Sequence, residues 1–189
     1  MPDTWKRIIA QLTHLVPNAV RSLRPPATAD ELTRLERVIG QSLPESFREY
    51  LGTCNGQETH DYAPLLFGFH CLLGTHDIAS LWTMQTALFA DEGPLEWVKE
   101  KKIRPVHWSR GWIAFTDYEA TDRLVLDLDP GKKGTPGQIF RHFPGIDLSD
   151  PDTVIAPSFE EFSKQMLARL EKKKFGLEEG IVVFDDDWI

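Results

Sequence analysis

Apolar residues recur at helical spacing in several stretches of the chain, and each stretch predicts a helix with one buried face. These stretches are residues 4–16, 28–40, 42–54, 77–89 and 158–170, with a shorter helical piece at 94–101. Three of the starts carry residue pairs that can form capping boxes: Thr28 with Glu31, Ser42 with Glu45, and Ser158 with Glu161. Asp77 is expected to cap the helix over 77–89, whose apolar stripe includes Leu88.

Short apolar or alternating runs predict strands between and after these helices. The runs are residues 64–73, 103–108, 112–116, 123–129, 138–143 and 180–184. Short connections join most of them, and such connections favour antiparallel neighbours, because a parallel crossover needs about a dozen residues. The order of elements therefore predicts an α+β fold, in which helices cover one face of an antiparallel meander sheet.

Turn residues and composition suggest how the chain is organised. Asn55, Gly56, Pro130 and Gly137 are predicted to form turns between elements. We expect one domain over residues 25–172. Residues 1–24 are expected to form an amphipathic helix and link that belong to this domain or pack on it, and residues 173–189 a strand-like acidic tail.

The charge of the chain limits the kinds of partner it suits. The net charge is −8 at pH 7, which repels phosphate backbones and disfavours nucleic acid as a partner. No apolar run reaches the roughly 20 residues of a transmembrane helix, and the N-terminus lacks the apolar core of a secretory signal. Two cysteines, Cys54 and Cys71, make no disulfide framework. We therefore expect a cytoplasmic protein without membrane attachment.

The chemically suggestive stretch is LDLDP, residues 126–130, where a strand runs into two aspartates. A strand that ends in D-x-D opens the haloacid-dehalogenase-like phosphatases, so a metal-dependent phosphohydrolase using Asp127 and Asp129 is one alternative. Gly131 departs from that family's pattern, and no alternating strands and helices follow. Two carboxylates are too few for calcium, and the scattered histidines have no metal-ligand spacing, so we expect no metal and no cofactor. On local physics, Asp129, Pro130 and Gly131 make a turn.

The segment HWSRGWIAFTDYEATDRLVLDLDPGKKGTPGQIFRHF, residues 107–143, resembles the signature of the Smi/Knr family within the SUKH superfamily. Its members show a Trp before an apolar strand, an acidic turn, L-D-x-D-P and then G-Q-V/I. The LP of Leu43–Pro44, the NG of Asn55–Gly56 and the APSFEEF of residues 156–162 follow the same family pattern, so the resemblance spans about residues 25–172. Ala114 and Phe115 depart from it, as do the extra N-terminal helix and the acidic C-terminal tip.

The resemblance implies an α+β fold, no enzymatic activity and a protein partner. Bacterial relatives are often immunity proteins that neutralise a polymorphic toxin, frequently a nuclease, whereas fungal relatives are regulators of cell-wall assembly. We expect the first role, with a regulatory scaffold as the alternative. An acidic and aromatic face would bind the toxin domain, and its predicted residues are Trp108, Trp112, Asp117, Asp127 and Asp129. Trp5 and Trp82 are expected in the core, and Trp188 is a further surface candidate.

Overall fold

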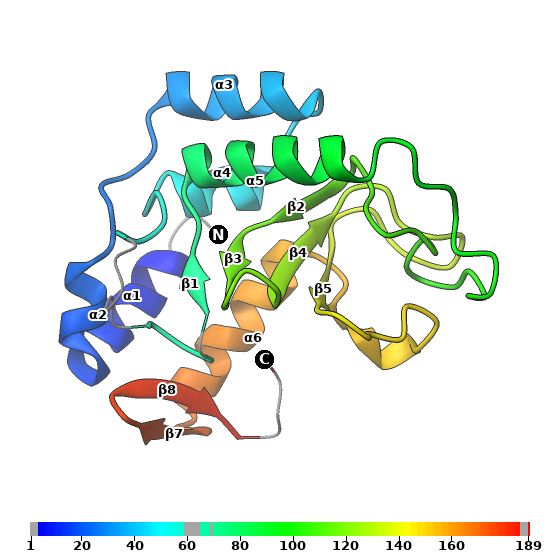
Figure 1. The fold of residues 1–189 in the computed structure, drawn as a ribbon. Coiled ribbons are helices and arrows are strands. Elements are labelled where there is room, and N and C mark those ends of the chain that lie inside the picture. Colours follow the sequence, from blue (N-terminus) through cyan, green and yellow to red (C-terminus); the bar gives the residue numbers. More distant parts are fainter. Residues whose placement is uncertain (1–3, 59–64, 69, 186–188) are drawn as a thin grey trace.

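The computed structural model describes residues 4–58, 65–68, 70–185 and 189 (Figure 1). Its helices are α1 (Thr4–Leu15), α2 (Pro17–Arg21), α3 (Ala29–Ile39), α4 (Glu45–Leu51), α5 (Thr75–Leu88) and α6 (Phe159–Glu171). Its strands are β1 (Cys71–Leu72), β2 (Trp112–Ala114), β3 (Thr116–Asp117), β4 (Arg123–Asp127), β5 (Gln138–His142), β6 (Val154–Ala156), β7 (Phe175–Glu178) and β8 (Ile181–Phe184). Within these residues, no helix combines the length and the apolar character needed to cross a membrane.

The central sheet has the order β2-β4-β5-β6, and every neighbouring pair is antiparallel. A short β1–β3 ladder and a β7–β8 hairpin lie outside it. Figure 1 shows α3 and α5 side by side above this sheet, with the β7–β8 hairpin at the other end of the molecule. Mixed helices and open antiparallel sheets confirm the predicted α+β fold.

Helix boundaries follow local capping chemistry at two of the three predicted capping boxes. Thr28 and Glu31 form a reciprocal capping box at the start of α3, and Gly40 ends that helix with a φ of +72°. Ser158 accepts a hydrogen bond from the Glu161 backbone N–H at the start of α6. The prediction for Ser42 and Glu45 is wrong, because Pro44 occupies the cap of α4 and no side chain bonds there.

Both faces of the central sheet are covered, by different kinds of structure. Leu124 and Leu126 of β4 face the main core, which α1, α3, α4 and α6 complete. Val125 faces the opposite way and packs with Ile103 and Leu148 from non-helical segments. Strand side chains alternate between faces, so helices cover one face, and irregular segments with Leu81 of α5 cover the other. The helical cover was predicted from the sequence, whereas the cover on the second face was not.

Several sequence predictions differ from the described structure. Residues 94–101 contain one short turn and are otherwise irregular, and residues 103–108 form an irregular segment. Both stretches were predicted as regular elements, and both lie within the described residues. Ile103 and Val106 still pack under the sheet, so their apolar character reflects burial without strand pairing. Of the predicted strand at 64–73, the described part forms a strand only over Cys71–Leu72, and Phe67 makes isolated bridges to His70 and Val182. Residues 64 and 69 are outside the described ranges.

Both ends of the described chain pack on the main core. Trp5, Ile8 and Leu12 of α1 are buried there, and the Trp5 indole N–H donates to Ser163 Oγ of α6 at 2.9 Å. Val182 and Phe184 of β8 reach the same core. Trp5 and Trp82 therefore lie in or against the core, as the sequence predicted.

Candidate functional site

Asp127, the last residue of β4, has no exposed surface. Its carboxylate accepts one hydrogen bond from Gln138 Nε2 at 2.8 Å and another from the Asp129 backbone N–H at 3.0 Å. Gln138 is its cross-strand partner on β5. The carboxylate therefore joins two strands to the turn that follows β4, and it presents no atom to a docked molecule.

Burial sets the protonation behaviour of Asp127. It raises the pKa of this carboxyl to about 6, because the ionised form loses hydration. The hydrogen bonds from Gln138 and the Asp129 backbone oppose the rise. The Trp112 indole N–H also lowers this pKa slightly, although it makes no hydrogen bond of normal geometry. Asp127 is therefore a buried acid whose charge is unfavourable to the fold.

Asp129 lies just beyond β4, and 44% of its side chain is exposed. Its Oδ2 accepts a hydrogen bond from Ser109 Oγ at 2.8 Å and forms an ion pair with Arg104. The backbone here runs close to Gly111, where an added Cβ would lie 2.2 Å from the Asp129 Cβ. Asp129 thus fastens the segment 104–111 to the end of the strand.

The 129–137 loop, which contains the GKKG sequence, is bonded to residues 101 and 102. The Gly131 N–H donates to the Lys102 carbonyl at 2.9 Å, and the Lys133 N–H donates to the Lys101 carbonyl at 3.0 Å. Gly137 closes the loop with a φ of +91°, a conformation that favours glycine. Because Gly131 and Lys133 donate within the chain, their N–H groups are not turned toward a phosphate ligand.

The two predicted tryptophans have different environments. Trp112 is completely buried, and its ring meets Trp108 edge-on at 6.0 Å between centroids. Trp108 is partly exposed and donates its indole N–H to Thr86 Oγ1 of α5 at 3.2 Å. Trp112 and Asp127 have no exposed area, so the structure contradicts their predicted place on a partner-binding face. The predicted surface residue Trp188 lies outside the described residues.

Asp117 is separated from the other predicted residues. It lies on β3 next to the beginning of β4, whereas Asp127 and Asp129 lie at the end of β4. Arg123 Nε donates to its Oδ1 at 2.7 Å, and the Ala120 backbone N–H donates to its Oδ2 at 3.1 Å. The structure therefore gathers Trp108, Trp112, Asp127 and Asp129, and leaves Asp117 outside that group.

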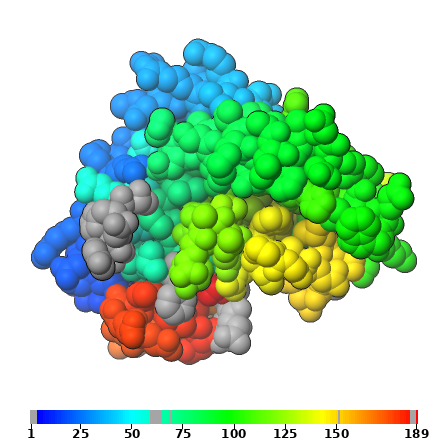
Figure 2. All heavy atoms as spheres, viewed as in Figure 1, coloured from blue at the N-terminus to red at the C-terminus, as the bar shows by residue number. Residues whose placement is uncertain are grey.

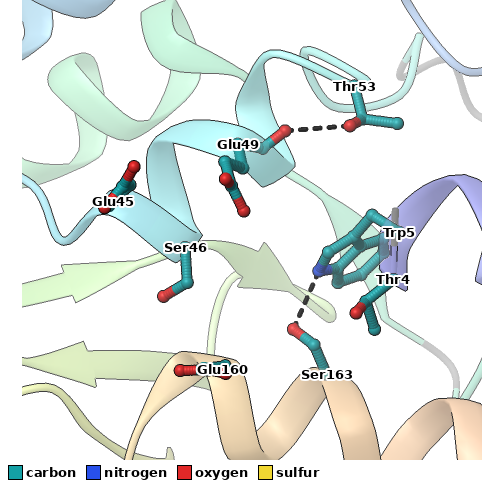
Figure 3. A pocket seen from close by; sticks show the side chains of 8 residues that line it. All are labelled: Thr4, Trp5, Glu45, Ser46, Glu49, Thr53, Glu160 and Ser163. Atoms are coloured by element: carbon teal, nitrogen blue, oxygen red, sulfur yellow. Dashed lines mark hydrogen bonds between the residues drawn. The ribbon is translucent and has the colours of Figure 1, made fainter. Parts of the chain in front are cut away.

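A hollow of about 560 Å³ lies between α1, α4 and α6 (Figure 3). Figure 3 shows Glu45 and Glu49 on α4 and Glu160 on α6 around it, with the Trp5–Ser163 hydrogen bond at its wall. Glu160 also pairs with Lys164 at 2.6 Å. An acidic lining of this kind disfavours an anionic ligand such as a nucleic-acid backbone.

The family model of the SMI1 / KNR4 family (SUKH-1) matches residues 26–165, which is more than half of the chain. The chain belongs to this family. A comparison with curated proteins found no match. SUKH domains are protein-interaction modules and are generally non-enzymatic. The matched range contains β2, β4 and β5 together with the 129–137 loop.

The predicted Asn55–Gly56 turn has a structural task within this SUKH domain. Asn55 Oδ1 accepts a hydrogen bond from the Thr75 backbone N–H at 2.7 Å, which caps the start of α5 from a distant part of the chain. Gly56 has a φ of +77°, and an added Cβ would lie 2.2 Å from the Gly74 nitrogen. Only glycine allows this approach. Asp77 supports the same helix start by accepting from the Gly74 N–H at 3.2 Å.

The exposed apolar side chains around α5 of the SUKH domain are not among the contact residues predicted from the sequence. Trp97 is 79% exposed, Leu88 is 65% exposed and Met84 is 55% exposed. Leu88 had been assigned to the apolar stripe of its helix, and Trp97 to a short helical piece. One sequence signal indicates this surface: residues 78–90 contain no charged side chain, which is unusual for a helix with an exposed side.

Proposed function

We propose that this SUKH domain is a bacterial immunity protein, which binds a cognate polymorphic toxin and neutralises it without catalysing a reaction. The observation that carries the proposal is the burial of Asp127, whose two oxygens both accept hydrogen bonds inside the fold. A carboxylate in that position is not available to attack a phosphoryl group. The LDLDP motif then serves the fold, and the role supported by the family is protein binding.

The charge of the chain favours a basic toxin domain. At a net charge of −8, the protein attracts cationic surfaces and speeds their encounter. A nuclease toxin suits this requirement, because its substrate groove must attract phosphates. The proposed place of action is the cytoplasm of the producing cell, with no nucleic acid or membrane as a ligand.

Three of the predicted contact residues retain exposed surface and stay in the proposal. Trp108 is partly exposed, and the side chains of Asp117 and Asp129 are 28% and 44% exposed. Each of the two carboxylates already pairs with an arginine of its own chain. A partner must therefore displace or share those arginines, so we assign these aspartates a secondary part in binding.

Growth of a host that expresses the toxin domain encoded beside this gene tests the proposal. Co-expression of the SUKH domain should restore growth, and the two purified proteins should form a stoichiometric complex. Magnesium-dependent turnover of a generic phosphate ester that Asp127→Asn abolishes would overturn the non-enzymatic assignment. Absence of both rescue and complex, with signalling proteins recovered as partners instead, would favour the regulatory scaffold.

A further inference from the structure

The outer side of α5 and the segment after it carry the most exposed large apolar side chains that the structure describes. We call Met84, Leu88 and Trp97 the α5 face. Met84 and Leu88 are four residues apart on the helix and are therefore neighbours on its surface. Trp97 belongs to the segment after α5, in which Leu95 and Val98 pack in the same cluster as Leu81 of the helix. Figure 2 shows α5 and this segment as a continuous strip across the visible surface.

The fold does not require these side chains to be apolar. The inner side of α5 already packs through Ile78, Leu81 and Trp82 against the rest of the protein. The neighbouring helix α3 places charged side chains on its solvent side, including Arg34 and Arg37, as a surface helix normally does. Single exposed apolar residues are ordinary, but a group that includes an almost bare tryptophan is typical of a protein–protein contact.

The charges beside the α5 face indicate what kind of surface it fits. Asp91, Glu92 and Glu96 are exposed, and residues 78–98 contain no lysine or arginine. Exposed cations beside this stretch are Lys99, which follows it, and Arg110, whose carbonyl accepts a hydrogen bond from Trp82 of α5. An isologous dimer would bring two sets of these carboxylates into one interface, and each chain carries a net charge of −8. Charge complementarity therefore disfavours a second copy and favours a basic partner.

We infer that the α5 face is the main partner-binding surface, and that it docks a protein surface on which apolar side chains are flanked by lysine or arginine. This inference rests on the proposed function, because it names where a toxin would bind. It also moves the centre of binding from the predicted LDLDP edge to an adjoining part of the molecule. Trp108, which bonds to Thr86 of α5, lies between the two regions.

A pair of labelled peptides tests the inference without a known partner. One is an amphipathic peptide of leucine and lysine with its leucines at helical spacing, and the other has glutamate in place of every lysine. Fluorescence anisotropy should show that the protein binds the cationic peptide and binds the anionic one at least about tenfold more weakly. Leu88→Asp and Trp97→Ala should each weaken the cationic complex about tenfold, as loss of a central contact does.

Leu177→Asp is the matched control, since Leu177 is 53% exposed but lies on β7, outside the α5 face. It should bind the cationic peptide like the unaltered protein, and thermal melting should show all three variants folded. Equal binding of both peptides would overturn the inference, as would variants of the α5 face that behave like Leu177→Asp. Sedimentation that shows a dimer disrupted by Leu88→Asp would assign the face to a second copy and also overturn it.

The growth assay separates this inference from the proposed function. If Leu88→Asp and Trp97→Ala still restore growth fully, the α5 face is not the toxin contact while the immunity function stands. If the unaltered protein gives no rescue but the peptide results are as expected, the immunity function fails and the basic-partner surface stands.

Discussion

Replacement of Asp127 by asparagine should make the stability of the protein less dependent on pH in a defined direction. The pKa of Asp127 is about 6 in the folded protein, because of burial, and about 3.9 in an unfolded chain. A pKa raised by folding means that the folded state binds the proton more tightly. The contribution is therefore fully present below about pH 4 and is lost as the pH rises through about 6. The difference between the two pKa values is worth about 3 kcal/mol.

Asp127→Asn removes this titration but also changes a hydrogen bond. The asparagine oxygen can accept from the Asp129 N–H, while its amide would face Gln138 Nε2, which already donates to the Lys102 carbonyl. That mismatch costs a similar amount at every pH, about 1–3 kcal/mol. The informative quantity is therefore the change with pH in the difference between the two proteins' unfolding free energies. Asp127→Asn should gain about 2 kcal/mol relative to the unaltered protein between pH 4 and pH 7, because most of the titration falls in this range.

Urea unfolding followed by tryptophan fluorescence, at several values across this pH range, measures the difference. Carboxylates elsewhere whose pKa is lowered by hydrogen bonds, such as Glu36, destabilise both proteins equally in acid and cancel. Asp91→Asn changes the same charge at an exposed position and controls for net charge. If the difference in unfolding free energy did not change with pH, burial would not raise the pKa of Asp127. A difference of opposite sign would show that its hydrogen bonds outweigh its lost hydration.

Three further substitutions test the contacts that hold the fold. Gly111→Ala should lower the free energy of unfolding by about 1–3 kcal/mol, because the added Cβ would lie 2.2 Å from that of Asp129. Gly93→Ala, whose added Cβ has nothing within 4 Å, should leave it unchanged. The melting temperatures of the two variants test this difference. Ser158→Ala should lower the free energy of urea unfolding by about 1 kcal/mol, because it removes the cap of α6. If Ser158→Ala lowered it no more than Ser80→Ala does, the cap would contribute nothing. Trp5→Phe should cost about 1–2 kcal/mol through the lost bond to Ser163 and the smaller ring, and an unchanged midpoint would show that this bond contributes nothing.

The sequence predicted those parts of the fold whose signals are local. Helices α3 and α6 begin at polar caps, and β4 and β5 are apolar runs separated by turn residues, so propensity and tertiary structure agree there. Strands β6 and β7 escaped prediction because β6 has three residues and β7 contains Gly176 and is largely exposed. Strand β6 pairs with a strand that is distant in sequence, and β7 pairs within a hairpin. Neither pairing produces a periodic pattern of apolar residues in the sequence.

The position of the candidate site in the chain was predicted from the sequence, but the burial of its residues was not. The LDLDP turn was expected from the sequence, and alternation along β4 places Asp127 on the side of the sheet away from the helical core. Alternation does not reveal that irregular segments cover the second face, because loops have no periodic pattern to match against it. Val125 on the same face was the available signal, since an apolar residue there indicates a strand buried on both sides.

The positions that identify the SUKH family and the positions that we propose for binding are different residues. Asp127, Gln138 and Gly56 act inside the fold, whereas Leu88 and Trp97 are exposed and lie outside the quoted motifs. Fold stability and partner choice should then be separable. Leu88→Asp should lose a partner at an unchanged melting temperature, whereas Gly111→Ala should melt earlier and still bind at temperatures well below its transition. If each variant lost both binding and stability, the partner would bind at the LDLDP edge, and the α5 face would unfold together with that edge.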